Sequence, residues 1–567
     1  MRINAAVSGF CLAVFSFSSI KIPFPRAQSR ATCSSALSGL GFRVREQVVL
    51  NRFLTERWLF AGLLTIFVVL RIGVLWHAQA DLHLDPDAYL GIAEKLANGQ
   101  GFSSPETGQP TAYRPPLYPL LLTPVSRPDQ VGARAGLHLT LAMITFLVVW
   151  QTGRQLQLSR WQICVAILFL TCDPLALRYL ALPMTETLCT CLTAVLLMLL
   201  TAGPCGVRSP TCIPLASPGF QFSKLGVPSL VTGLITGAVF GLVVLSRPTF
   251  WIFGLMFALF WGLRQGRLAS SRDSSSGNSS ELGKIFPVLQ VAGAAMGICV
   301  MVVPWVIRNA VVMHSPILMT THGGYTLLLG NNAAFYREVV QQPWGTIWDG
   351  SHGAGQAGWL QQTLEEAAQA GVSGEIQLDR WMSHRAQQAI ASHPRTFLRA
   401  CFLKFLWFWN IGPQGPEADN FSPVVLWGVR VFYILFWSLA VIGFMRVFRR
   451  IPEWERALSS GRDAHGIRGS KNSGIRVRMG RMTGGIFHQF CPKDPLAWKW
   501  RILLILIVSL NAAHLVYWSD ARMRAPLLPA LALLAAAAFR GPHQEVSPLG
   551  AFSKSKLLSS VSAGKGF

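Results

Sequence analysis

Residues 285–306 read IFPVLQVAGAAMGICVMVVPWV, an apolar run that contains no charged side chain. A helix of about 20 such residues is long enough to cross the hydrocarbon core of a bilayer. Nine further runs along the chain have a similar character, so we predict about ten transmembrane helices. The predicted spans are 58–77, 135–152, 161–180, 183–202, 228–246, 248–263, 285–306, 424–445, 501–518 and 525–540.

The composition of the whole chain agrees with this prediction. Among its 567 residues, 51% are hydrophobic and only 13% are charged, which is about half the charged share of a soluble domain. The 19 Trp and 34 Phe exclude an intrinsically disordered chain, because such chains contain few aromatic residues. We therefore predict an all-α polytopic membrane protein, with the lipid bilayer as its first partner.

A net charge of +24 has two explanations. A basic surface can bind nucleic acid, but alternation through ten spans puts nearly the whole excess on one side. The segments on that side are 1–57, 153–160, 203–227, 264–284, 446–500 and 541–567. The other side receives the near-neutral loops 78–134 and 307–400. Because basic loops stay in the cytoplasm, we predict a multi-pass protein of the cell (plasma or inner) membrane and no nucleic-acid partner.

The predicted division of the chain follows from these segments. The basic segment 1–57 is predicted to be a poorly ordered tail. Its first residues are apolar, so two alternatives stay open: a signal peptide, or a start of the chain that was assigned wrongly. The Gly- and Ser-containing basic loop 446–500 is predicted to be mobile. The remaining parts are a membrane core 58–306, an outer acceptor-side region 307–400, an interfacial helix and span 401–445, two last spans 501–540 and a cytoplasmic tail 541–567.

The outer loop 78–134 begins with an amphipathic helix that is too short and too charged to span a membrane. Its apolar residues recur at helical spacing, and Gly99 suits its end. Asp85 and Asp87 stand at its start, where carboxylates commonly cap the free N–H groups of a helix. Two carboxylates at a membrane surface also suit a glycosyl transfer, in which one of them takes a proton from the acceptor.

Arg114 is the second notable residue of this loop. It precedes Pro115 and Pro116, and a proline restricts the residue before it to an extended backbone. A guanidinium held near the lipid headgroups can bind two oxygens of a phosphate. An interfacial Tyr-Arg anchor is an equally good explanation.

The order of these motifs resembles the C superfamily of membrane glycosyltransferases (GT-C). Residues 87–102 have the form DxYxxIAxxLxxGxGF, and residues 114–119 read RPPLYP. The chain is most similar to the branch with the dolichyl-phosphate-mannose protein mannosyltransferases and the lipid A aminoarabinose transferase. Further matching elements are LPMTE at 182–186, SRPT at 246–249, PWVIRN at 304–309, THGG at 321–324, GNN at 330–332 and RMRAPLLP at 522–529.

The resemblance implies transfer of a sugar from a polyprenyl-phosphate donor to a glycan, lipid or protein acceptor on the extracytoplasmic face, with inversion at the anomeric carbon. Asp87 matches the catalytic acidic residue, with Asp85 as the alternative, because the branch often has an adjacent Asp-Glu pair there. Glu186 matches a second acidic position. The candidate ligands of the donor phosphate are Arg114, Arg247, Arg308 and Arg524.

His322 and Asn331 are candidates for the acceptor side of the site. His322 falls where the aminoarabinose transferase branch has a metal-associated histidine, but this chain lacks a Glu immediately before Arg114. A divalent metal is thus left open, and no cofactor is assigned. Each candidate also has a structural explanation: Glu186 can cap a helix, and arginines at span ends often reach the headgroups.

Two other classes of protein remain as alternatives. A secondary transporter places ionisable residues near the middle of broken spans in two repeated halves, whereas the notable charges here lie at span ends. A non-catalytic polyprenyl-lipid-binding protein of envelope assembly would have the same fold without the chemistry. Label transfer from a lipid-phosphate sugar separates the enzyme from both.

Overall fold

The structure, a computed structural model, describes residues 37–202, 227–273, 282–419, 421–463 and 495–539. Across these ranges the regular elements are helices, and the only pairing of extended chain is an isolated bridge between Ser103 and Pro110. The predicted tail 541–567 lies outside the described residues, and so do most of 1–57, of the predicted loop 203–227 and of the basic loop 446–500.

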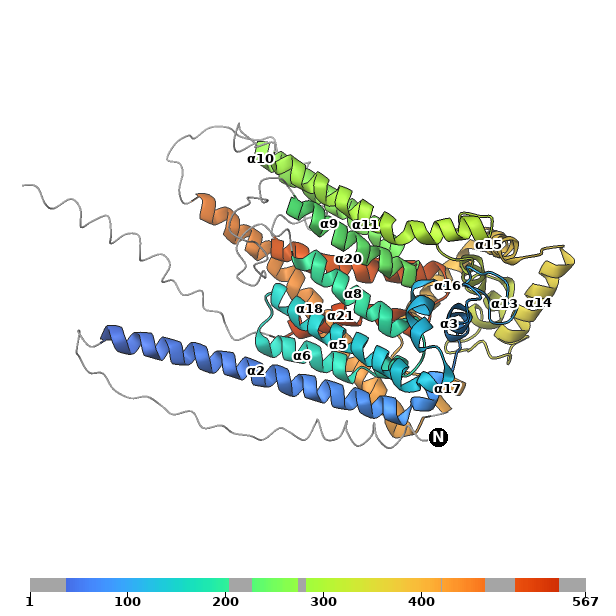
Figure 1. Ribbon diagram of the computed structural model, residues 1–567, viewed down its shortest axis with the longest axis horizontal. Coiled ribbons are helices and arrows are strands. Elements are labelled where there is room, and N and C mark those ends of the chain that lie inside the picture. The colour runs from blue at the N-terminus through green and yellow to red at the C-terminus, as the bar shows by residue number, and fades with distance from the viewer. Residues whose placement is uncertain (1–36, 203–226, 274–281, 420, 464–494, 540–567) are drawn as a thin grey trace, which may run out of the picture.

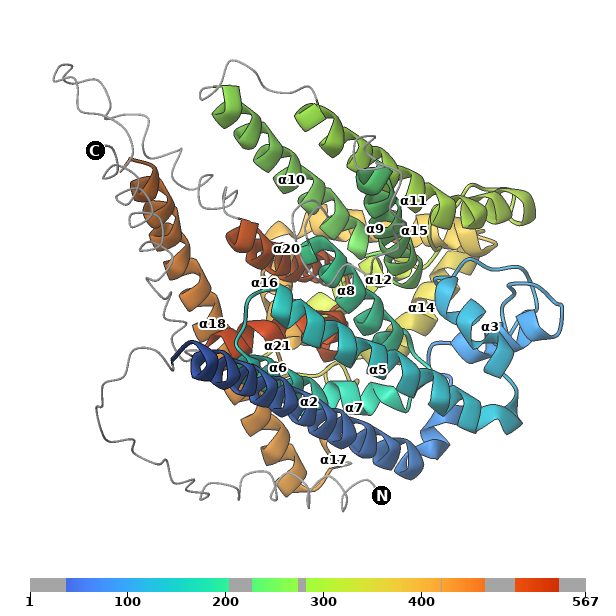
Figure 2. The same ribbon diagram turned by 60° about the vertical axis from the view of Figure 1, so that its left-hand side comes forward.

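The helices of the bundle run back and forth between the two ends of the molecule (Figure 1). They are α2 (Leu37–His77), α5 (Val131–Gln155), α6 (Arg160–Cys172), α8 (Thr185–Ala202), α9 (Val227–Ser246), α10 (Phe250–Asp273), α11 (Leu282–Val312), α18 (Pro423–Asp463), α20 (Pro495–Val516) and α21 (Leu528–Ala537). In both views α9, α10 and α11 form one flank of the bundle, and α2 lies on the opposite flank (Figure 2).

Other helices and helical turns gather at one end of the bundle, on the right in Figure 1. They are η1 (Gln79–His83), α3 (Tyr89–Ala97), α4 (Leu117–Leu122), η2 (Thr123–Val125), η3 (Pro128–Gln130), α12 (Gly323–Leu329), α13 (Ala333–Phe335), the π-helical turn η5 (Tyr336–Val340), α14 (Gly355–Gln369), α15 (Glu375–Ser392), α16 (Pro394–Phe408), α17 (Pro416–Asp419) and η6 (Ala521–Leu527). The two loops predicted to share one side therefore lie at the same end. The larger of the two loops, 307–400, contributes to a small apolar core of its own, which includes Phe335, Trp348, Trp359 and Met382.

The prediction of a helical polytopic membrane protein is confirmed. Seven described helices are long and apolar enough to cross a membrane, and the pair α6 and α7 (Pro174–Leu180), bent by 50°, would make an eighth. The predicted count of about ten is too high by this measure. The spans predicted at 248–263 and 525–540 form α10, which turns polar after Leu263, and α21, whose ten residues are about 15 Å long.

Two helices extend beyond the predicted membrane spans. α2 begins at Leu37, so the last part of the predicted tail 1–57 is helical, and α18 continues to Asp463 within the predicted mobile loop. Residues 37–57 contain no proline, and a helix that is already formed extends at little cost through residues that tolerate it. Charge and polarity therefore mark where a helix leaves the membrane, and not where the helix ends.

Close backbone contact joins α9 and α11. A Cβ atom added to Gly237 would lie 2.0 Å from the carbonyl oxygen of Ala294, and Gly233, Gly293 and Gly297 make similar approaches. Small residues let two membrane helices approach this closely, and the gain is van der Waals contact along both backbones. The pair α9 and α11 thus forms a tightly packed unit.

We predict that Gly237→Ala destabilises the protein, because the added methyl group forces α9 and α11 apart. The expected loss is about 2 kcal/mol, as for overpacked cores, measured as thermal unfolding in detergent. The matched control is Gly262→Ala on α10, where a Cβ meets no atom within 4 Å. That control is expected to be neutral or slightly stabilising, and equal behaviour of the two variants would contradict the prediction.

Candidate functional site

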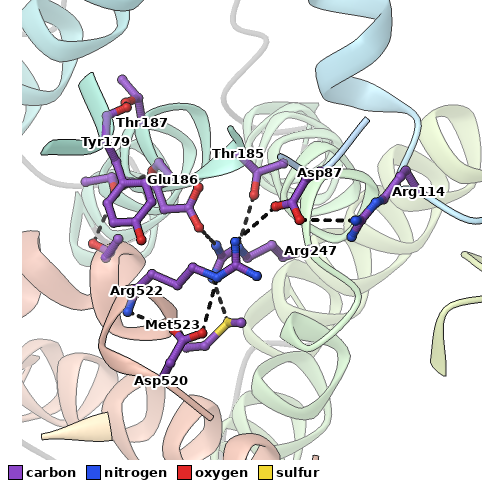
Figure 3. A network of polar contacts seen from close by, with 12 residues as sticks. Asp87, Arg114, Tyr179, Thr185, Glu186, Thr187, Arg247, Asp520, Arg522 and Met523 are labelled. Carbon is purple, nitrogen blue, oxygen red and sulfur yellow. Dashed lines mark hydrogen bonds and ion pairs between the residues drawn. The ribbon is translucent and has the colours of Figure 1, made fainter. Parts of the chain in front are cut away.

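Asp87 lies at the bundle end that carries the short helices, in the turn before α3. Its carboxylate is held by two arginines from distant parts of the chain (Figure 3). Arg114 Nη2 lies 3.1 Å from Oδ1, and Arg522 Nη1 lies 3.0 Å from Oδ2. Each oxygen therefore accepts a charge-assisted hydrogen bond, the stronger kind in proteins.

These arginines determine the protonation of Asp87. Burial raises the pKa of the carboxyl group, but the charges of Arg522 and Arg114 lower it by more, and the pKa lies below its ordinary value of 3.8. Asp87 is therefore a carboxylate at neutral pH and can accept a proton.

A second ion pair lies in the same network. Glu186, in the first turn of α8, is 2% exposed, and its Oε1 lies 2.5 Å from Arg247 Nη2. Arg247 directly follows α9, and its Nε donates to the hydroxyl of Thr185 at 3.4 Å. Burial lowers the pKa of Arg247, but Glu186 raises it by more, so the guanidinium stays charged. The other oxygen of Glu186 has no hydrogen-bond partner among the described residues.

Arg522 is a site residue that sequence reasoning missed. Its Nε lies 3.3 Å from Oδ2 of Asp520, which also caps η6. Burial lowers the pKa of Arg522, and Asp520 and Asp87 together raise it by more. Of the two arginines in the segment RMR at 522–524, the sequence pointed to Arg524 as the candidate phosphate ligand. However, η6 is a 3-10 helix with about three residues per turn. Residues two apart then point in different directions.

Arg524 accordingly serves another part of the structure. It is 1% exposed, and its Nη1 donates to the carbonyl oxygens of Phe408 at 2.9 Å and Asn410 at 2.6 Å. Phe408 is the last residue of α16, where a helix has unpaired acceptors, and Asn410 lies two residues further on. The structure does not bring Arg524 to Asp87, and its predicted phosphate contact remains a prediction.

Arg308 and Asn331 also lie apart from the ion pairs. Arg308 donates to the carbonyl oxygens of Thr111 at 2.8 Å and Phe102 at 2.6 Å, and so braces the loop that carries Arg114. Asn331 is fully buried and donates to the carbonyl oxygen of Val516. Their predicted roles in donor or acceptor binding also stay predictions.

Asp85 and Asp87 differ in what their carboxylates do. The oxygens of Asp85 accept the backbone N–H groups of Leu90 at 2.9 Å and Gly91 at 2.8 Å, so Asp85 caps α3. Burial raises the pKa of Asp85, and these N–H groups offset only part of that rise. Ala88 has a left-handed backbone with φ 59°, and this sharp turn separates the cap from Asp87. The geometry favours Asp87 over Asp85 as the proton acceptor.

His322 lies beside this network, with its ring 4.4 Å from the ring of Tyr113. Burial lowers its pKa to about 3, with the charge of Arg114 in support, so the imidazole is neutral. Among the described residues, no group of three or more His, Cys, Asp or Glu side chains is arranged to hold a metal ion, and both Asp87 oxygens bind arginines. The possible divalent metal therefore stays a prediction.

An apolar cavity of about 490 Å³ lies between the segment 96–120 and the helices α9 and α11. Pro116 and Leu245 line it, and each is two residues away from an arginine of the network, Arg114 and Arg247. Arg308 is the one charged residue in its lining. The lining residues include Leu96, Phe102, Leu117, Leu120, Met301 and Trp305.

These features define a class of protein: a polytopic helical membrane protein with paired carboxylates and arginines at one end of its bundle, next to an apolar cavity. No protein-family model matches the chain. No curated relative matches it either.

A solved structure that is similar to the chain is the crystal structure of ArnT from Cupriavidus metallidurans bound to undecaprenyl phosphate. The identity is 12%, the match covers 84% of this chain and 77% of that one, and the TM-score is 0.32. A likeness this loose transfers no residue role, so the class rests on the helices and the site themselves.

We predict that the ion pairs of Asp87 make its contribution to stability dependent on pH. Because the folded protein lowers this pKa, the contribution is complete above the unfolded value near 3.8 and is lost as the pH falls through the lower folded value. In thermal unfolding between pH 7 and pH 3, the difference between wild type and Asp87→Asn should shrink below about pH 4. A constant difference would contradict the assignment.

Proposed function

We propose that the chain transfers a sugar from a polyprenyl-phosphate donor to an acceptor hydroxyl or amine. The observation that carries the proposal is Asp87 between Arg114 and Arg522, because it places a proton acceptor and two phosphate-binding groups together. The pair Glu186 and Arg247 adds a second acid and a third guanidinium to the same network.

The arginines suit the donor phosphate. A guanidinium presents its N–H groups as a fork that matches two phosphate oxygens, and positive charge stabilises the phosphate as it leaves the sugar. Arg114 and Arg522 each pair with one Asp87 oxygen, and Arg522 also pairs with Asp520 through its Nε. A guanidinium has five N–H groups in all, so each arginine has others to offer a phosphate. The apolar cavity lined by Pro116 and Leu245 could hold the isoprenoid chain of the donor, which supports the proposal of a lipid-linked donor.

Asp87 suits the acceptor. The acceptor oxygen or nitrogen attacks the anomeric carbon, the bond from this carbon to the phosphate oxygen breaks, and the electron pair leaves with the phosphate. The proton of the acceptor passes to Asp87. Binding of the donor phosphate to Arg114 and Arg522 draws them from the carboxylate, which raises the pKa of Asp87 and makes it a stronger base.

The membrane location and sidedness are part of the proposal. The near-neutral segments 78–134 and 307–400 lie at the end that holds Asp87, and the basic termini of α2 and α18 point to the other end. Because basic segments stay in the cytoplasm, the transfer takes place on the extracytoplasmic face of the cell membrane. The acceptor is a glycan, lipid or protein that reaches this face. The proposed assignment to a branch of the GT-C superfamily rests on the motifs at 87–102 and 114–119.

We predict that Asp87→Asn lowers transfer at least about 100-fold, the usual effect of losing a general base. The assay uses the purified chain in nanodiscs with a panel of radiolabelled undecaprenyl-phosphate sugars and a membrane extract as the acceptor. Asp85→Asn should keep its activity while lowering stability, because its carboxylate caps α3. The matched control is Asp81→Asn, which loses only an exposed pair with Arg178.

Three results would contradict the proposal. Full transfer by Asp87→Asn means that another group takes the proton. Uptake of a solute by proteoliposomes without any transfer indicates a transporter. Binding of the lipid phosphate without transfer to any acceptor indicates a non-catalytic lipid-binding protein.

A further inference from the structure

Glu375, the first residue of α15, connects two segments that carry site residues. Its Oε2 accepts a hydrogen bond from the hydroxyl of Thr111 at 2.6 Å, and its Oε1 accepts one from the backbone N–H of Ala112 at 2.9 Å. The hydroxyl of Thr321 also donates to Oε1. One carboxylate thus holds residues that lie 264 and 54 positions away in the chain.

The hydrogen bonds continue from Glu375 toward the site. The Thr111 hydroxyl donates its proton to Glu375 and accepts the backbone N–H of Tyr113 at 2.9 Å. The orientation of the peptide between Ala112 and Tyr113, one residue before Arg114, therefore depends on the carboxylate. On the other segment, Thr321 donates its backbone N–H to the carbonyl oxygen of Ala112 at 3.0 Å.

Asp379 repeats the arrangement one helical turn further along α15. Its Oδ1 accepts the backbone N–H of Gly324 at 2.6 Å. A Cβ atom at Gly324 would lie 2.0 Å from the carbonyl oxygen of Asp379, so only glycine allows this approach. The start of α15 therefore holds the segment 321–324 on both sides of His322.

We propose that Glu375 is a positioning residue for the sugar-phosphate site. Its carboxylate fixes the positions of the segments before Arg114 and His322 relative to each other, and we call these hydrogen bonds the Glu375 clamp. Arg114 then points at Asp87, and the ring of Tyr113 packs on His322. The role assigned to Arg114 and Asp87 rests on the proposed function, but the hydrogen bonds of Glu375 do not. Misplacing a site residue by about 1 Å can cost about 100-fold in rate, which makes such a clamp consequential.

The test uses Thr111→Val, which keeps the shape of the side chain but removes the hydroxyl between Glu375 and Tyr113. Thr111→Ser keeps the hydroxyl, and Glu375→Gln removes the charge. The matched control is Glu366→Gln, which loses only an exposed pair with Arg385. The whole chain in nanodiscs is used for each variant.

Two measurements are made on each variant. Hydrogen–deuterium exchange over residues 110–116 should become about tenfold faster in Thr111→Val and Glu375→Gln, and stay at the wild-type rate in Thr111→Ser and Glu366→Gln. The affinity for undecaprenyl phosphate, measured by titration, should fall about tenfold in the first two variants. The double variant Thr111→Val with Glu375→Gln should bind no more weakly than either single variant, because both remove the same clamp.

The outcomes separate the clamp from the function. If Thr111→Val and Glu375→Gln bind undecaprenyl phosphate as tightly as the wild type and their hydrogen–deuterium exchange is unchanged, the clamp is overturned and the proposed function is not. Faster exchange with unchanged binding shows that Glu375 stabilises the loop and does not position the site, which also overturns the proposal. Failure of the wild type to bind undecaprenyl phosphate contradicts the proposed function, and the exchange data then still report on the hydrogen bonds of Glu375.

Discussion

A bilayer core contains no water that could satisfy backbone N–H and C=O groups, and this constraint shapes the rest of the molecule. Each crossing must be a complete helix that bonds its own backbone. Charged side chains are costly in the core, so they collect where helices end. The candidate site follows from this arrangement, since Asp87, Glu186, Arg247 and Arg522 all lie at or beside helix ends on one side of the bundle.

The arginines at this end serve two different purposes. Arg308 and Arg524 donate to backbone carbonyls and so fasten loops and helix ends. Arg114, Arg247 and Arg522 pair with carboxylates instead. Three arginines face three carboxylates, with Asp520 as the third acid, so the network is neutral when no ligand is bound. In the proposed reaction, the donor phosphate competes with Asp87 for these guanidinium groups, so that donor binding and the release of the proposed base are linked.

Hydropathy and charge alone predicted the helical membrane fold, and they also predicted which loops share an end of the bundle. Both properties depend on stretches of about 20 residues and on the charges between them. Within the described ranges, seven or eight helices meet the length and hydropathy of a span, fewer than the ten predicted, because α21 is short and α10 turns polar halfway along. The same reasoning gave bounds for the membrane spans alone, and α2 and α18 continue beyond those bounds.

Within the site, the sequence determined the types of residue present: acids at the starts of α3 and α8, and arginines before Pro115 and after α9. Local signals sufficed for these, because caps, prolines and span ends are properties of neighbouring residues. Only the tertiary structure decided that Asp85 caps α3 while Asp87 meets the arginines, and that Arg522 rather than Arg524 faces Asp87. It also revealed Glu375. The partners in these contacts lie up to 435 positions apart, and the direction of each side chain depends on the packing of helices that no local pattern records.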